Sequence, residues 1–104
     1  MIQFIKNLLG LGEKIDLGEL IAQGAKIIDV RSAGEFQGGH LKNSVNIPLD
    51  KLRDNLSKLD KSQVIITCCA SGMRSASAKS ILKSNGFAEV HNGGGWTNLR
   101  KFDV

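Results

Sequence analysis

The sequence predicts an α/β fold in which helices flank both faces of a central, mostly parallel sheet. Short, β-branched apolar segments at 26–30 and 63–69 are typical of strands that are buried on both faces. Segments with helical spacing alternate with them, which favours parallel strands joined by helical crossovers. The 104 residues suffice for one compact domain, whereas two domains would each be too small to bury a useful core.

The first half of the chain carries the weaker signals. Asp16 can cap a short helix over 17–23, and Gly24 ends that helix because glycine readily adopts the left-handed conformation. The strand at 26–30 comes next. A weaker strand at 44–47 is closed by the only proline of the chain.

The second half carries the stronger signals. A helix is expected from residue 50 onward, because four leucines form one apolar stripe: Leu49, Leu52, Leu56 and Leu59. The strand at 63–69 leads into a helix over 73–86, in which Gly86 is the C-terminal stop. A last short strand at 88–92 precedes three glycines and a final helical stretch that holds the only tryptophan.

Residues 1–14 are interpreted as an N-terminal helical extension and residues 15–104 as the domain. Ile2, Ile5 and Leu9 have helical spacing, so the extension could dock a partner, lie on a membrane surface or pack on its own domain. It lacks a signal-peptide cleavage site, and no stretch reaches the roughly 18 to 20 apolar residues that cross a bilayer. A cytoplasmic protein with reduced thiols is therefore expected.

The charge distribution argues against nucleic acid as a partner. Fourteen Lys and Arg against ten Asp and Glu give a net charge of +4, but the basic residues are scattered and only 5% of the residues are aromatic. A single small anion suits this balance better.

The two cysteines are adjacent, in the stretch CCASGMRS at 68–75. Neighbouring Cα atoms lie about 3.8 Å apart, which is too close for an ordinary disulfide. A zinc site is not expected either, because the other available ligands are two scattered histidines, His40 and His91. The sequence thus predicts no metal and no cofactor.

Cys69 stands where the strand at 63–69 meets a loop and the start of a helix. Loop amides and a helix N-terminus stabilise a thiolate at such a position and lower its pKa from about 8.5. Cys69 is therefore the candidate nucleophile, and the candidate binding loop is Ala70, Ser71, Gly72, Met73 and Arg74. Cys68 should face the other side of the strand as a buried thiol, because successive strand residues point in opposite directions.

Three stretches resemble the rhodanese family of single-domain sulfurtransferases. They are IDVRSAGEFQGGHLKNSVNIPL at 28–49, CASGMRS at 69–75 and GFAEVHNGGGW at 86–96. Together they span nearly all of residues 15–100. The resemblance implies that Cys69 takes a sulfane sulfur from a donor such as thiosulfate and holds it as a persulfide. A nucleophilic acceptor then removes the sulfur, while the loop amides stabilise the thiolate and the persulfide.

The same resemblance implies that Asp29 and Arg31 support the fold and the rim of the site. Asp29 is expected to pair with a positive group near the site, and Arg31 to form an ion pair with Glu35. His40 is expected to be a structural histidine rather than a partner of the cysteine. Trp96 is expected to anchor the last helix.

One departure from the family pattern concerns the sulfur donor. Ala70 stands where some relatives carry a basic residue, which leaves Arg74 as the only cation of the loop. Doubly charged thiosulfate is then less favoured, and a protein persulfide or a small organic one becomes a stronger candidate. The expected partners are a small sulfur-containing anion and a protein sulfur donor or acceptor.

Two other functions remain open at this point. A cysteine phosphatase or arsenate reductase also places a thiolate in an anion-binding loop that ends in arginine. That loop is one residue longer than the four residues that separate Cys69 from Arg74. The second alternative is a non-catalytic sulfur-relay or scaffold module that binds a partner.

Overall fold

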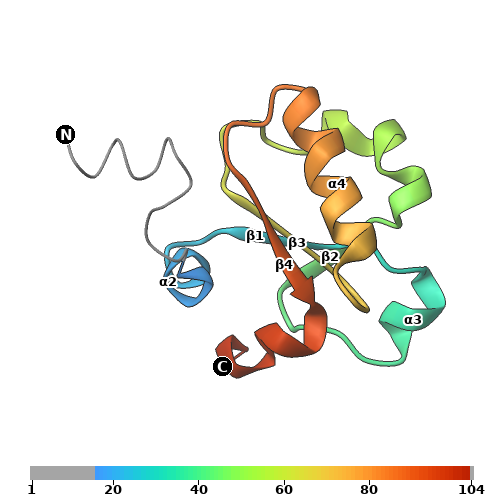
Figure 1. Cartoon of the computed structure of the whole chain (residues 1–104), viewed down its shortest axis with the longest axis vertical. Helices are drawn as coiled ribbons and strands as arrows, with labels where there is room; N and C mark the ends of the chain where they lie inside the picture. The colour runs from blue at the N-terminus through green and yellow to red at the C-terminus, as the bar shows by residue number, and fades with distance from the viewer. Residues whose placement is uncertain (1–15, 104) are drawn as a thin grey trace.

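Four parallel strands form a single sheet in the computed structural model, which describes residues 16–103. The strand order is β2-β1-β3-β4 (Figure 1). The strands are β1 (Lys26–Asp29), β2 (Ser44–Asn46), β3 (Ile65–Cys69) and β4 (Val90–Gly95). Every neighbouring pair is parallel, as predicted. The expected helical extension over residues 1–14 lies outside the described residues.

Within residues 16–103, α-helices and 3₁₀ helices connect the strands. The α-helices are α2 (Leu17–Ala22), α3 (Ala33–Gln37) and α4 (Met73–Ser84). The 3₁₀ helices are η1 (Leu49–Lys51), η2 (Arg53–Lys58) and η3 (Trp96–Phe102). No helix in this part of the chain is long and apolar enough to cross a membrane.

The helical segment expected from residue 50 is present, but it consists of two short 3₁₀ helices, η1 and η2, instead of one α-helix. The side-chain amide of Asn55 donates to the carbonyl O of Lys51 at 2.7 Å. In an α-helix that carbonyl would accept the backbone N–H of residue 55, which here donates to Leu52 at 3.0 Å. The asparagine side chain thus competes with the backbone and tightens the turn.

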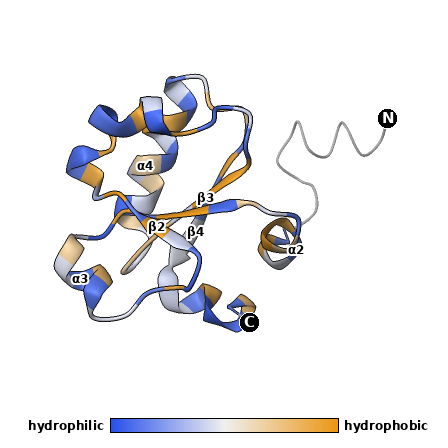
Figure 2. Ribbon diagram, turned by 180° about the vertical axis from the view of Figure 1, so that it is seen from behind, coloured by the Kyte–Doolittle hydropathy of each residue, from blue (hydrophilic) through white to orange (hydrophobic). Residues whose placement is uncertain are grey.

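Helices cover both faces of the sheet, as the apolar strands predict. On one face α4, η1 and η2 enclose a core that includes Ile28, Val30 and Cys69. On the other, α2 and η3 pack over Ile66 and Cys68. Figure 1 shows α4 on one side of the strands, with α2 and the C-terminal helix on the other. Figure 2 shows hydrophobic residues in β3 between these layers, and all five residues of this strand are buried.

The carboxyl ends of the strands meet at one edge of the sheet because all four are parallel, and the loops to α3, η1 and α4 start there. The pairing of β3 with β4 is irregular between Thr67 and Cys69, and it aligns Cys69 with Gly95. Irregular pairing of this kind is common next to active sites. The candidate nucleophile therefore lies beside a glycine of β4.

Candidate active site

Cys69 is the last residue of β3, and the following loop folds back over its sulfur. The backbone N–H of Gly72 donates to Cys69 Sγ at 3.0 Å, and that of Ser75 at 3.4 Å. The Ser75 hydroxyl lies 3.5 Å from the same sulfur. Cys69 is fully buried, whereas Ala70 and Ser71 are exposed on the loop. The loop thus forms a cradle around one sulfur atom, in which two backbone N–H groups donate to the sulfur and the Ser75 hydroxyl lies beside it.

Glycines allow the loop and β4 to approach each other closely. Gly72, which precedes α4, has a φ of +101°, a conformation that other residues rarely adopt. A Cβ on Gly72 would lie 3.3 Å from Cα of Gly94, and one on Gly95 would lie 2.8 Å from the carbonyl O of Ala70. The glycines before Trp96 therefore belong to a strand that walls the loop, rather than to a plain turn.

The cradle changes the acidity of the Cys69 thiol. Burial alone raises its pKa, because a thiolate loses solvation in the protein interior. Hydrogen bonds from the Ser75 hydroxyl and from the amides of Ser75, Gly72 and Ser71 oppose burial and outweigh it. The net result is a pKa below the ordinary value for cysteine, which favours a nucleophilic thiolate.

The sequence and the fold of this chain are matched in known proteins. The rhodanese-like domain family matches residues 14–101. The chain is 33% identical to the thiosulfate sulfurtransferase PspE of Escherichia coli over 92% of this chain and 92% of PspE. It is 35% identical to the protein YqhL of Bacillus subtilis over 65% of this chain, and spans only 54% of the length of YqhL.

The fold agrees with this sequence match. The structure superposes on the human single-domain sulfurtransferase TSTD1 with a TM-score of 0.74 and 25% identity, covering 82% of this chain and 89% of TSTD1. The chain belongs to the rhodanese-like family. The predicted resemblance is thereby confirmed over almost the whole domain.

Ser75 and Asn92 complete the site of this rhodanese-like domain, and the sequence did not single out either of them. The Ser75 hydroxyl lies 2.6 Å from Asn92 Oδ1, which also accepts the backbone N–H of Gly94 at 2.8 Å. The Asn92 side-chain amide donates to the carbonyl O of Gly72 at 3.2 Å. Asn92 thus links β4 to the loop and orients the hydroxyl beside Cys69.

Arg74 is held by an acidic partner from another loop. Its guanidinium binds both carboxylate oxygens of Glu35, at 2.7 and 3.0 Å. This hydrogen bond, together with the backbone N–H of Ser32, lowers the pKa of Glu35 to about 2. Glu35 is therefore ionised at neutral pH, and it offsets the positive charge that Arg74 brings to the loop.

The expected ion pair between Arg31 and Glu35 is wrong, because Arg31 pairs with Asp29 instead. Arg31 Nη2 lies 2.8 Å from Asp29 Oδ2, and both side chains are buried. Arg31 contacts Glu35 only through the backbone carbonyl, at 3.3 Å, and it also donates to the carbonyl O of Gly39 at 2.7 Å. The guanidinium stacks on Trp96 at 4.5 Å. Asp29 and Arg31 thus tie the end of β1 to the loop around α3.

Cys68 lies on the other face of β3, in the core under α2 and η3. Burial and the nearby Asp29 carboxylate raise the pKa of the Cys68 thiol to about 12. Cys68 is therefore a neutral, enclosed thiol at ordinary pH, whereas its neighbour Cys69 has a lowered pKa. Adjacent positions on one strand thus give the two cysteines opposite chemical properties.

His40 makes local contacts only. Its ring stacks on Phe36 with centroids 3.7 Å apart, and its Nδ1 lies 2.7 Å from the Phe36 carbonyl O.

The described part of the chain contains no cluster of three or more potential metal ligands. The donors around Cys69 are thus amides and a hydroxyl, which suit a sulfur anion rather than a metal ion.

Proposed function

We propose that this rhodanese-like domain transfers sulfane sulfur through a persulfide on Cys69. The Cys69 thiolate attacks the sulfane sulfur of the donor, a new S–S bond forms, and the donor's own S–S bond breaks. The leaving group keeps the electron pair; it is sulfite when the donor is thiosulfate. A nucleophile such as cyanide then takes the outer sulfur, and the electron pair of the broken bond returns to Cys69. The cycle balances without a cofactor.

The observation that carries this proposal is the set of donors around Cys69 Sγ. Two backbone amides and one hydroxyl lie within 3.0 to 3.5 Å of the sulfur. Such fixed dipoles stabilise the anion both before the attack and after the acceptor has left. Cys69 is a free thiol, as the cycle requires. A cytoplasmic location, where thiols stay reduced, is part of the proposal.

The charges at the loop favour a persulfide donor over thiosulfate. Arg74 is the loop's cation, and Glu35 offsets its charge through two hydrogen bonds. A dianion gains little attraction from such a pair, whereas a protein persulfide or a small organic persulfide carries less charge on the reacting sulfur. We therefore propose a persulfide as the preferred donor and thiosulfate as a working substitute.

Intact-mass measurement tests the proposed cycle directly. Incubation with thiosulfate is expected to add one sulfur atom to Cys69, and subsequent cyanide is expected to remove it and release thiocyanate. The Cys69→Ser variant should gain no sulfur, and Cys68→Ser should still gain one. Release of phosphate from an aryl phosphate, without sulfur uptake from any sulfane donor, would instead support the phosphatase alternative.

A scaffold function has one observation in its favour. Met73, at the start of α4, is 79% exposed, and among the described residues only one other large hydrophobic side chain, Val45, is exposed. A partner protein could cover Met73 while exchanging sulfur with Cys69. If Cys69→Ser retains full activity in a complementation assay and Met73→Asp loses it, the scaffold function replaces the catalytic one.

Replacing Glu35 by glutamine is expected to lower the KM for thiosulfate about two- to fivefold, the effect of one exposed ion pair. The variant leaves the Arg74 charge unopposed, while glutamine can still serve the capping box of α3. Steady-state thiocyanate formation at low salt measures the change, which should shrink as salt is added.

Glu19→Gln provides the matched control, because it removes the same charge from α2, which packs on the opposite face of the sheet from α4. An unchanged or higher KM in Glu35→Gln, or an equal change in Glu19→Gln, contradicts the assigned role of Glu35.

A further inference from the structure

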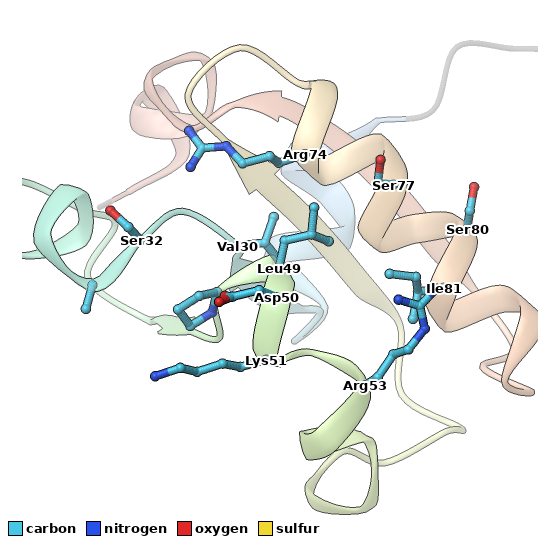
Figure 3. A pocket seen from close by; sticks show the side chains of 12 residues that line it. Val30, Ser32, Leu49, Asp50, Lys51, Arg53, Arg74, Ser77, Ser80 and Ile81 are labelled. Atoms are coloured by element: carbon cyan, nitrogen blue, oxygen red, sulfur yellow. The ribbon is translucent and has the colours of Figure 1, made fainter.

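A groove of about 890 Å³ lies on the face of the sheet that carries α4, and it shares Arg74 with the loop after Cys69. Its apolar lining residues are Val30, Ala33, Pro48, Leu49 and Ile81. Its walls also carry the hydroxyls of Ser32, Ser77 and Ser80, and four charged side chains. The loops after β1 and β2 and the outer face of α4 thus enclose it together (Figure 3). This volume is far larger than thiosulfate or cyanide needs.

The groove follows α4 from Arg74, at the end of the loop, toward the last turn of the helix. Arg74, next to the Ser75 amide that binds Cys69 Sγ, lines one end, and Ile81 lines the other. Seven residues of α-helix separate them, which corresponds to about 10 Å along the helix axis. Figure 3 shows Arg53 directed toward the Ile81 end. A ligand that spans the groove from Arg74 to Ile81 therefore covers about 10 Å along α4.

The charges along the groove favour an anionic group at the far end. Arg53 and Lys51 line the groove, together with a single acidic residue, Asp50. Neither cation forms an ion pair with any residue of the described range, whereas Arg74 is engaged by Glu35. A carboxylate of a ligand can therefore pair with Arg53, whereas Arg74, at the loop end of the groove, is already paired with Glu35.

The walls of the groove suit a peptide backbone. Ser77 and Ser80 lie one helical turn apart on α4, and both are exposed. Among the described residues their hydroxyls have no hydrogen-bond partner, so they can donate to peptide carbonyls or accept peptide amides. An extended peptide covers about 10 Å in three residues.

We propose that the groove binds an acidic peptide thiol as the sulfur acceptor, with its cysteine at the cradle and a carboxylate about three residues away at Arg53. This inference rests on the proposed persulfide cycle. The peptide thiol loses its proton to solvent, and its thiolate attacks the outer sulfur of the Cys69 persulfide. The new S–S bond forms on the peptide, the bond to Cys69 Sγ breaks, and Cys69 retains the electron pair. The peptide leaves as a persulfide.

Two capped tetrapeptides test the proposal, N-acetyl-Cys-Gly-Gly-Asp-amide and its Asn counterpart, which differ in one charge. Cys69 is first loaded with sulfur from thiosulfate, excess donor is removed, and the loss of sulfur to each peptide is followed by quenched mass spectrometry. The Asp peptide is expected to reach half-maximal rate at about two- to fivefold lower concentration than the Asn peptide. Arg53→Gln should abolish this preference without changing the rate with cyanide.

Lys83→Gln is the matched control, because Lys83 lies on α4 outside the groove and loses the same charge. It should keep the preference for the Asp peptide. Equal behaviour of the two peptides with the wild-type chain, or a preference that survives Arg53→Gln, overturns the groove proposal while the persulfide cycle stands. Failure of thiosulfate and of small persulfides to load Cys69 overturns the cycle itself, and the groove proposal with it.

Discussion

Replacing Asp29 by asparagine is expected to lower the free energy of unfolding by about 3 to 5 kcal/mol. Asp29 is fully buried and accepts hydrogen bonds from Arg31 Nε and Nη2 at 2.8 to 3.1 Å. The substitution preserves the shape of the side chain but leaves a buried guanidinium without its counter-charge. In a domain of this size, such a loss lowers the melting temperature by more than about 10 °C. Urea unfolding measures the free energy.

The double variant Asp29→Asn with Arg31→Met separates the ion pair from mere packing. Removing both charges also removes the penalty for an unpaired one, so the double variant should recover at least half of the stability that the single variant loses. A single variant within about 1 kcal/mol of the wild type, or a double variant no better than the single one, contradicts this account.

Replacing Ser75 by alanine is expected to slow persulfide formation at neutral pH about tenfold to hundredfold. A hydrogen bond to a charged group contributes about 1.5 to 3 kcal/mol, and the Ser75 hydroxyl is one of the groups that lower the pKa of Cys69. Its loss raises that pKa, so the thiolate forms only at higher pH. The pH profile of Cys69 alkylation by iodoacetamide measures the shift, and its midpoint should move to higher pH.

Two features keep this measurement specific to the cradle. Cys68 is buried with a pKa of about 12, so it should not react over the same pH range. Ser84→Ala serves as the control, because the Ser84 hydroxyl binds the carbonyl O of Ile81 in the last turn of α4. An alkylation midpoint that stays in place in Ser75→Ala, or moves equally in Ser84→Ala, means that the hydroxyl does not act on the thiolate.

The sequence predicted the parts of the fold and of the site that depend on local signals. The buried strand at 63–69, its abrupt end at Cys69 and the small residues after it indicate a cradle without any tertiary information. The helix α4 follows from the helical segment after the loop, which Gly86 terminates. The opposite orientations of Cys68 and Cys69 follow from strand geometry.

The remaining contacts depend on tertiary packing. Glu35 is 39 residues from Arg74 in the chain, and Asn92 is 17 residues from Ser75. No local pattern shows that α3 turns its carboxylate toward α4, or that an exposed asparagine of β4 reaches the loop. Helix α3 has only five residues, too few for a periodic signal, and its capping box of Ser32 and Glu35 was its sole local sign.

The placement of the two cysteines on opposite faces of β3 determines how the domain withstands oxidants. A low-pKa thiol such as Cys69 is prone to sulfenic acid formation, and many redox proteins rescue that state with a second thiol nearby. Cys68 is the only other cysteine of the chain, and it is enclosed in the core under α2 and η3. Repair of an oxidised Cys69 therefore depends on thiols from outside the chain. Under the proposed persulfide cycle, the molecules that accept its sulfur would also determine how long the domain survives oxidative stress.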